Sequence, residues 1–581
     1  MRLFQTSLLV LGLPLLGAAC TGGVAGTDGS RAGTPGAPTD STGMPGVPTG
    51  MPSTSPTGTS TIPVVPVQLP AAGALGPIAL RRLNKWEYDN TVQRLGAAPG
   101  ASSAFAEDDP SLGYNNMAAA LTVTPLLAEQ YARAAKALAA GLNLVQEAPC
   151  ADGAAGAAET ACATAFIEQF GKRSFRRPLT GEEITAYTAI FQEKRARGDY
   201  AGGIRLVAET MLQSPHFLYK TEIGEGSGVD RALTAYELAS QISYLALGGP
   251  PDDELLAAAQ GAKLSSPAER EVQLRRLLTK PESTPWVASF VTRWLGIAEA
   301  GYLAKDQTAF PSYTPSLSVA VAEESQRFIA DLFAQSNGSL ETLFTANFTL
   351  SNAELGAHYG LGQVPTAWEK VTLPAGQRLG VLTQPAFLVA TSKSADSFPI
   401  RRGKTLRTRI LCGDVPPPPP NLEIMPVELN PNLTTRERFV QHQQAGSVCA
   451  SCHSLIDPLG FGFENYDATG AYRTTENNKP IDASGEIKAI APEIDGPFAN
   501  ALEFTQRIAP SQVLKACVAR ESLRWSLGRA TLDTPPTDPK VLRDQAIIQG
   551  LAARLGMANS DIRELLVAVV LRDEYGFRSD Q

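Results

Sequence analysis

A recurring signal for helix starts is the feature that most constrains how this chain can fold. In a capping box, a short polar residue precedes the helix and Glu follows three residues later, so that each side chain bonds the other's backbone N–H group. Apolar residues at three- and four-residue spacing follow these boxes, as in an amphipathic helix. The boxes stand at Asn84 with Glu87, Thr180 with Glu183, Thr234 with Glu237 and Thr434 with Glu437. The pattern predicts a mainly α, multidomain helical protein.

The first 75 residues differ in composition from the rest. An apolar run ends at Ala19 and is followed by Cys20, which is the pattern of a lipoprotein signal peptide over residues 1–20 with Cys20 as the lipidated residue. Ordinary cleavage near Ala19 is the alternative. Residues 21–75 are rich in Gly, Pro, Thr and Ser and have no aromatic side chain, which predicts a disordered tether. We expect an exported lipoprotein of the outer membrane or cell surface, or alternatively a periplasmic protein.

The spacing of three residues indicates a covalently bound cofactor. Cys449, Cys452 and His453 form the string Cys-x-x-Cys-His, in which the two thiols add to the vinyl groups of haem and the imidazole coordinates the iron. The string predicts one covalent haem c with His453 as the proximal iron ligand. Two alternatives are a Cys449–Cys452 disulfide and a zinc site, which would need two more ligands that the sequence does not place nearby.

The sixth coordination position of this iron has few candidate ligands. No histidine follows His453, and the only later methionine is Met557. His442 and Met425 lie upstream and are the candidate distal ligands. An open sixth position is the alternative, and it would permit small-molecule chemistry as well as electron transfer.

Residues near the string offer further contacts to a haem. Phe461, Phe463 and Tyr466 are expected either to cover the haem or to pack in the core. A basic run is expected either to pair with the haem propionates or to lie on a solvated helix face. This run comprises Arg401, Arg402, Lys404, Arg407 and Arg409.

Four of the seven cysteines remain when Cys20 and the haem string are set aside. An even remainder in an exported protein predicts two disulfides. Cys150 and Cys162 flank a Gly/Ala-rich loop and form the local pair, which leaves Cys412 with Cys517 by elimination. This is one of the three pairings that four cysteines allow.

Clusters of turn residues divide the chain after the tether into expected domains. These are helical domains at 76–150, 158–225 and 230–372, a cytochrome-like haem-binding domain at 375–495 and a C-terminal helical domain at 500–581.

Six short strings resemble those of a known family. They are Leu80–Tyr88, Phe175–Leu179, Ser214–Tyr219, Arg402–Lys404, Cys449–Asp467 and Leu527–Arg529. In combination they resemble the secreted planctomycete and myxobacterial (lipo)proteins built from serial domains of unknown function, in the series DUF1587, DUF1595, DUF1592, DUF1588 and DUF1585. The resemblance implies an exported protein with a cytochrome-like C-terminal part, and it supplies no catalytic residues. His216 and His358 look like family positions and are expected to be packing residues.

The sequence therefore predicts a lipid-anchored monohaem protein that acts in electron transfer or in a haem-linked redox step. Its expected partners are a redox partner or a surface ligand that the sequence does not name, and the membrane through the N-terminal lipid. The net charge of −8 argues against nucleic acid. The competing hypothesis is a non-enzymatic surface binding or assembly protein with Cys449–Cys452 as a structural disulfide. A third hypothesis is a haem-dependent oxidoreductase, and it requires an open coordination position on the iron.

Overall fold

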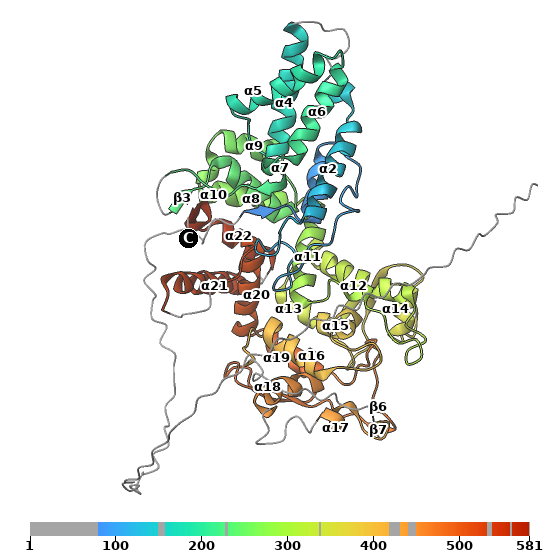
Figure 1. Cartoon of the computed structure of the whole chain (residues 1–581). Helices are drawn as coiled ribbons and strands as arrows, with labels where there is room; N and C mark the ends of the chain where they lie inside the picture. The colour runs from blue at the N-terminus through green and yellow to red at the C-terminus, as the bar shows by residue number, and fades with distance from the viewer. Residues whose placement is uncertain are drawn as a thin grey trace, which may run out of the picture. The chain divides into compact units, whose positions relative to one another are not determined.

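Helices dominate the fold (Figure 1). The structure is a computed structural model, and it describes residues 80–148, 157–226, 230–335, 338–416, 430–439, 449–531, 537–557 and 561–579. Within these ranges the strands are short and pair two by two. This arrangement confirms the expected mainly α fold. The predicted signal peptide at 1–20 and tether at 21–75 lie outside the described residues.

The helices before residue 219 share one hydrophobic core. They are α1 (Lys85–Arg94), α2 (Pro125–Ala140), α3 (Leu144–Glu147), α4 (Ala157–Phe175), α5 (Gly181–Arg195), α6 (Tyr200–Gln213) and α7 (Pro215–Leu218). Helices α2, α4 and α5 all pack against α6. Aromatic rings fill the centre, with the ring centroids of Tyr88 and Phe105 4.9 Å apart and those of Phe105 and Tyr131 5.0 Å apart. Residues from both expected domains, 76–150 and 158–225, therefore lie in the same core.

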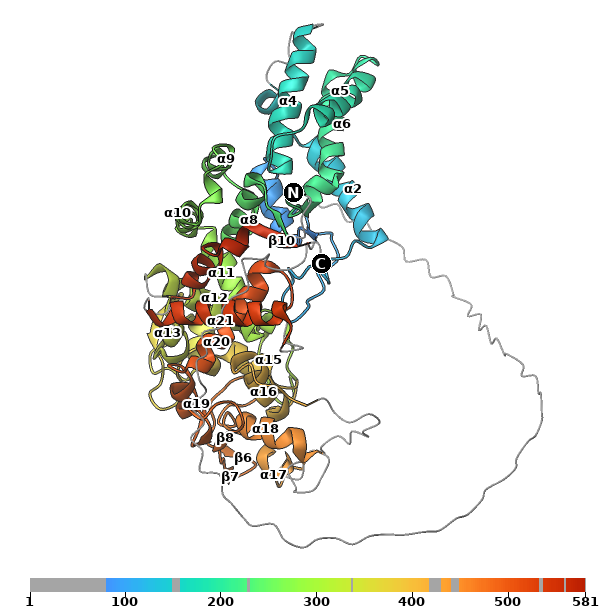
Figure 2. The same cartoon turned by 90° about the vertical axis from the view of Figure 1, so that its left-hand side faces the viewer.

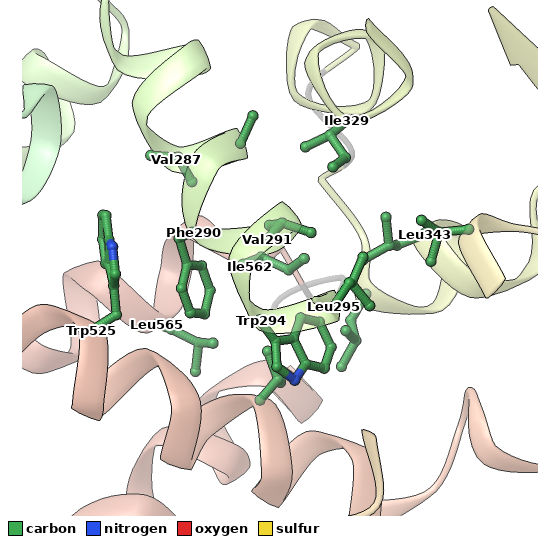
Figure 3. Packing of buried hydrophobic residues seen from close by; sticks show 14 of the residues in the cluster. Val287, Phe290, Val291, Trp294, Leu295, Ile329, Leu343, Trp525, Ile562 and Leu565 are labelled. Carbon is green, nitrogen blue, oxygen red and sulfur yellow. The ribbon is translucent and has the colours of Figure 1, made fainter. Parts of the chain in front are cut away.

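A second, larger core begins with the helices in the middle of the chain. These helices are α8 (Ala235–Leu247), α9 (Asp253–Gln260), η2 (Lys263–Ser265), α10 (Pro267–Leu278), α11 (Ser283–Leu295), η3 (Ala300–Tyr302), α12 (Pro315–Ala334), α13 (Leu340–Thr345) and α14 (Ala353–His358). Helix α11 lies inside this core, and Figure 3 shows its residue Phe290 beside Trp525 and Leu565 of the C-terminal part.

The C-terminal third of the chain completes the larger core. Its helices are η4 (Val381–Thr383), α15 (Pro385–Ala390), α16 (Pro399–Thr405), the π-helix η5 (Leu406–Ile410), α17 (Thr435–Phe439), α18 (Ala450–Phe461), α19 (Ala501–Ile508), α20 (Gln512–Leu527), α21 (Pro539–Met557), α22 (Arg563–Val570) and η7 (Asp573–Gly576). Helix α22 packs on α8 and α10, and α20 packs on α11, although about 200 residues or more separate these partners (Figures 1 and 2).

The strands form antiparallel pairs that close local loops or join distant segments. The pairs are β1 (Arg81–Arg82) with β2 (Tyr219–Lys220), β3 (Asp230–Ala232) with β10 (Phe577–Ser579), β4 (Phe348–Ser351) with β5 (Glu369–Thr372), β6 (Thr475–Glu476) with β7 (Lys479–Pro480), and β8 (Gly485–Ile487) with β9 (Gly496–Phe498). The first two pairs bring the beginning and the end of the described chain to the segment around residues 219–232.

The predicted capping boxes are present. At α1, α5 and α8 the cap side chain accepts from the backbone of the third helical residue, and the Glu side chain accepts from the cap backbone. Before α17 the same exchange joins Thr434 and Glu437 at 2.7 and 3.2 Å. These helix starts are confirmed.

The structure contains the Cys412–Cys517 disulfide that the cysteine count predicted. Cys412 follows η5 and Cys517 lies in α20, with their Cα atoms 5.4 Å apart. The bond fixes the π-helix to the C-terminal helices. Cys162 is also disulfide-bonded, and its expected partner Cys150 lies outside the described residues.

Candidate functional site

The Cys-x-x-Cys-His string begins helix α18. Cys449 is the residue before the helix, and its carbonyl accepts from the backbone N–H of His453 at 3.0 Å. Cys449, Cys452 and His453 stand at positions i, i+3 and i+4, which place them on one face of a helix. Both cysteines are partly buried free thiols, so they are not joined to each other. One helical turn thus presents two thiols and an imidazole together.

The His453 ring is held in place by a buried carboxylate one turn further along α18. His453 Nδ1 lies 3.0 Å from both carboxylate oxygens of Asp457, whose side chain is fully buried. Because a carboxylate only accepts hydrogen bonds, Nδ1 carries the proton and the lone pair of the neutral ring is on Nε2. Histidines that bind metals are commonly oriented in this way by a second group.

Helix α18 is fixed against α16 by two glycines at a close crossing. A Cβ atom on Gly403 would lie 1.8 Å from the Ile456 carbonyl oxygen, and one on Gly460 would lie 2.0 Å from the Pro399 carbonyl oxygen. Only glycine permits backbones to approach this closely. The crossing therefore sets the position of the helix that carries the string.

A buried ion pair joins α16 to the segment after the string. Arg402 on α16 is fully buried, and its guanidinium lies 3.4 Å from Glu464 and donates to the Phe463 carbonyl. Glu464 also accepts from Ser397 at 2.7 Å and from Arg473 at 3.1 Å. Burial lowers the pKa of Arg402 and raises that of Glu464, and the attraction between the two charges opposes both shifts.

Three members of the basic run have structural roles that the sequence did not indicate. Arg402 makes the ion pair described above. Arg407 is buried and donates to the carbonyls of Asp414, Lys488 and Ala489. Arg409 donates to the carbonyl of Arg293 at 2.8 Å. A solvated helix face is therefore wrong for these three, whereas Arg401 and Lys404 are exposed.

The aromatic residues after the string pack inside the protein. Phe461, Phe463 and Tyr466 are all buried. The Phe463 ring packs against Phe504, with centroids 5.8 Å apart, and the Tyr466 hydroxyl donates to the carbonyl of Gln377 at 2.6 Å. These residues were expected either to cover a haem or to pack in the core, and Phe463 and Tyr466 pack in the core.

The structure does not test the two candidate distal ligands. His442 and Met425 lie outside the described residues, as does the expected lipidation residue Cys20. Met557 ends α21 with 77% of its surface exposed. His216 is an exposed residue 3.6 Å from Glu183. His358 lies against the Thr469 carbonyl, 3.1 Å from Nε2, and burial lowers its pKa to about 4.

Sequence reasoning missed a buried carboxylate in α12. Glu324 is fully buried and accepts from the hydroxyls of Thr349, at 2.6 Å, and Tyr359. Burial raises its pKa to about 7. The Arg378 guanidinium stacks on the Tyr359 ring at 4.5 Å and donates to the Gly470 carbonyl, which connects this network to the segment after α18. The sequence held a signal, because Glu324 precedes the apolar Phe328 by four residues and so shares its helix face.

The structure defines a mainly α protein with the Cys-x-x-Cys-His string near its C-terminus. Four family models match it in series, each described as a protein of unknown function. They are PSD3 (DUF1587) at 81–142, PSD5 (DUF1595) at 162–222, PSD4 (DUF1592) at 233–361 and PSCyt3 (DUF1588) at 378–476. The chain belongs to the family built from these serial domains of unknown function, and the name PSCyt3 fits the cytochrome-like part.

No curated protein and no solved structure matches the chain. Among the helices of the described ranges, none is long and apolar enough to cross a membrane.

Proposed function

We propose that this chain carries one covalent haem c and acts as an exported, lipid-anchored redox protein. Cys449 and Cys452 would bind the haem through thioether bonds, and His453 would coordinate the iron. The single observation that carries the proposal is the pair of unjoined thiols beside an imidazole whose Nδ1 is held by Asp457.

The residues of the string fit a haem in three respects. The thiols are partly exposed, so they can react with vinyl groups. They share one helix face with His453. The Asp457 carboxylate leaves the lone pair of the imidazole on Nε2, the nitrogen that would face the iron. A bound haem would supply a one-electron couple between ferric and ferrous iron.

The residues around the string would hold and orient the group. Asp457 fixes the tautomer and the angle of the His453 ring. The Gly403–Gly460 crossing and the Arg402–Glu464 pair hold α18 on α16, so the three ligating side chains keep their position. The Cys20 lipid and the 21–75 tether, both expectations from the sequence, would keep the folded part at a membrane surface of the periplasm or cell exterior.

The test is an optical spectrum and an intact mass of the chain expressed with a cytochrome c maturation system. The variant Cys449→Ala/Cys452→Ala should lose both the Soret band and the covalent haem mass. Ser451→Ala is the matched control, because it changes an exposed residue inside the string and leaves the three ligating residues intact.

The other outcomes separate the competing hypotheses. A properly matured but colourless wild type would overturn the haem proposal. In that case, a mass lower by two hydrogens at Cys449 and Cys452 would favour a disulfide-bonded binding or assembly protein. A haem protein with a high-spin spectrum and an open iron position would favour an oxidoreductase, whereas a low-spin spectrum would favour an electron carrier.

A further inference from the structure

A cavity of about 390 Å³ lies between α1, α11 and α12, far in sequence from the haem string. Two tryptophans line it. Trp86 on α1 has 40% of its surface exposed, and Trp286 on α11 is almost fully buried. Their ring centroids are 6.0 Å apart, and the Trp286 indole N–H donates to the Leu245 carbonyl at 3.0 Å. The cavity thus has a fixed indole at its base and an accessible one at its edge.

The other lining residues are mostly polar. More than half carry hydroxyl, amide or charged side chains, and Asn115 and Gln326 each supply donors and an acceptor. This composition differs from the apolar lining that is usual for hydrophobic ligands. The face of an indole is electronegative and attracts polarised C–H groups. A ring that combines a C–H face with many hydroxyl groups, as a sugar does, fits both features.

The charges in the cavity wall favour an anionic ligand. Arg327 is paired with Glu323 through a 2.9 Å bond from Nε. Arg293 lies 4.0 Å from Glu299, which is too long for a hydrogen bond. Burial lowers the pKa of the Arg293 guanidinium, and the nearby charges of Glu299, Asp108 and Glu107 offset this only in part. A further carboxylate would therefore relieve its poor solvation. The lining residues carry two positive charges and one negative charge, in a chain whose net charge is −8.

We propose that this cavity binds an acidic oligosaccharide. A sugar ring would stack on the exposed face of Trp86, and a sugar carboxylate would pair with Arg293. The amides of Asn115 and Gln326 would bond the hydroxyl groups. This binding site is independent of the haem proposal.

The experiment is calorimetric titration of the full chain with trimers of galacturonate, glucuronate and mannuronate, and with cellotriose as the neutral probe. We expect at least one acidic trimer to bind and cellotriose to bind at least tenfold more weakly. Trp86→Ala and Arg293→Gln should each weaken the acidic trimer about tenfold or more, which corresponds to about 1.4 kcal/mol. Tyr302→Ala is the control, because Tyr302 is 85% exposed and does not line the cavity.

Two further measurements keep the test decisive. Thermal unfolding of each variant shows whether it is folded, and the indole fluorescence of the wild type should change when the acidic trimer binds. Absence of binding by every acidic trimer up to about 1 mM would overturn the proposal. Equal affinity for cellotriose, or undiminished binding by both folded variants, would overturn it as well.

Discussion

At the scale of single residues, Glu222 is a charged side chain buried between two arginines. The Glu222 carboxylate accepts from Arg81 at 2.5 Å and from Arg578 at 2.8 Å, and all three side chains are buried. Beside them, the fully buried Lys220 pairs with Glu87. A buried charge is tolerated only when it is paired in this way. Glu222 therefore joins the beginning and the end of the described chain.

Glu222→Gln should strongly destabilise the protein. The change removes the carboxylate that pairs with both Arg81 and Arg578, so two guanidinium groups stay buried without this partner. We expect the free energy of unfolding to fall by about 3–5 kcal/mol, measured by urea denaturation. Glu193→Gln is the control, because the Glu193–Arg197 pair is largely exposed, and it should change stability by less than about 1 kcal/mol. Similar effects of the two substitutions would contradict this account.

The same carboxylate should make stability depend on acidity. Burial raises the pKa of Glu222, but the Arg81 and Arg578 charges outweigh burial and lower this pKa from 4.5 to about 2. Because the folded pKa lies below the unfolded one, the stabilisation is present above about pH 4.5 and is lost as the pH falls toward 2. Unfolding free energies measured between these values should fall less steeply in Glu222→Gln than in the wild type. Parallel pH profiles would refute the assignment.

Asp457 is predicted to tune the haem iron if the proposed cofactor is present. Asp457→Asn removes a buried negative charge and weakens the hydrogen bond to His453 Nδ1. Since a negative charge near the iron favours the ferric state, the midpoint potential should rise, on the order of 60 mV for a tenfold change in a one-electron equilibrium. Redox titration of the matured protein measures it, with Ser451→Ala as control. An unchanged potential would show that Asp457 has only a structural role.

At the scale of elements, the crossing of α16 and α18 positions the candidate site. The two helices approach so closely that Gly403 and Gly460 each face a backbone carbonyl of the partner helix. Arg402, the neighbour of Gly403, reaches the segment after α18 through Glu464. Helix α16 thus supplies both the close contact, through Gly403, and the buried charge, through Arg402. These two contacts give the string Arg402–Lys404 a role in holding the fold together.

Gly403→Ala should separate these helices. The added methyl would lie 1.8 Å from the Ile456 carbonyl oxygen, and the backbone cannot give way as a flexible side chain would. We expect the free energy of unfolding, measured by chemical denaturation, to fall by about 1–3 kcal/mol or more. Gly556→Ala is a matched control in helix α21, where nothing lies within 4 Å of the new Cβ, and it should be neutral or slightly stabilising. Equal stability of the two variants would disprove the tight crossing.

At the scale of the whole folded part, distant segments share one core. Residues from α8 to η7 belong to the larger hydrophobic cluster, and the C-terminal helices α20 and α22 pack on α11, α8 and α10. The Cys412–Cys517 disulfide links two positions 105 residues apart within this part. Cross-linking of a long loop restricts the unfolded chain, which favours the folded state.

Removal of this disulfide should lower stability more than removal of the two unjoined thiols of Cys449 and Cys452. Cys412→Ala/Cys517→Ala should cost about 2–5 kcal/mol in the free energy of unfolding, measured under oxidising conditions. In haem-free protein, Cys449→Ala/Cys452→Ala is the control, because these thiols are not joined in the structure. A comparable loss in the control would indicate that Cys449 and Cys452 do form a disulfide.

Much of the fold could be predicted because helix starts are local. The boxes at Asn84, Thr180, Thr234 and Thr434 act within one helical turn, so the residues themselves contain the information. The Cys412–Cys517 bond was one of three pairings that the count allowed, and it was preferred because Cys150 and Cys162 are close in the sequence. The string at Cys449 likewise identified the candidate site from spacing alone.

Only the tertiary structure decided which charges are buried and what holds them. Arg402 meets Glu464 across 62 residues, and Glu324 meets Tyr359 across 35. The neighbours of Arg402 in the sequence do not show that it faces the core. The sequence by itself determined where helices begin and which residues could bind a haem, because those signals act within a turn. The packing of segments far apart in the chain determined burial and the α16–α18 crossing, because burial depends on residues that the local sequence does not contain.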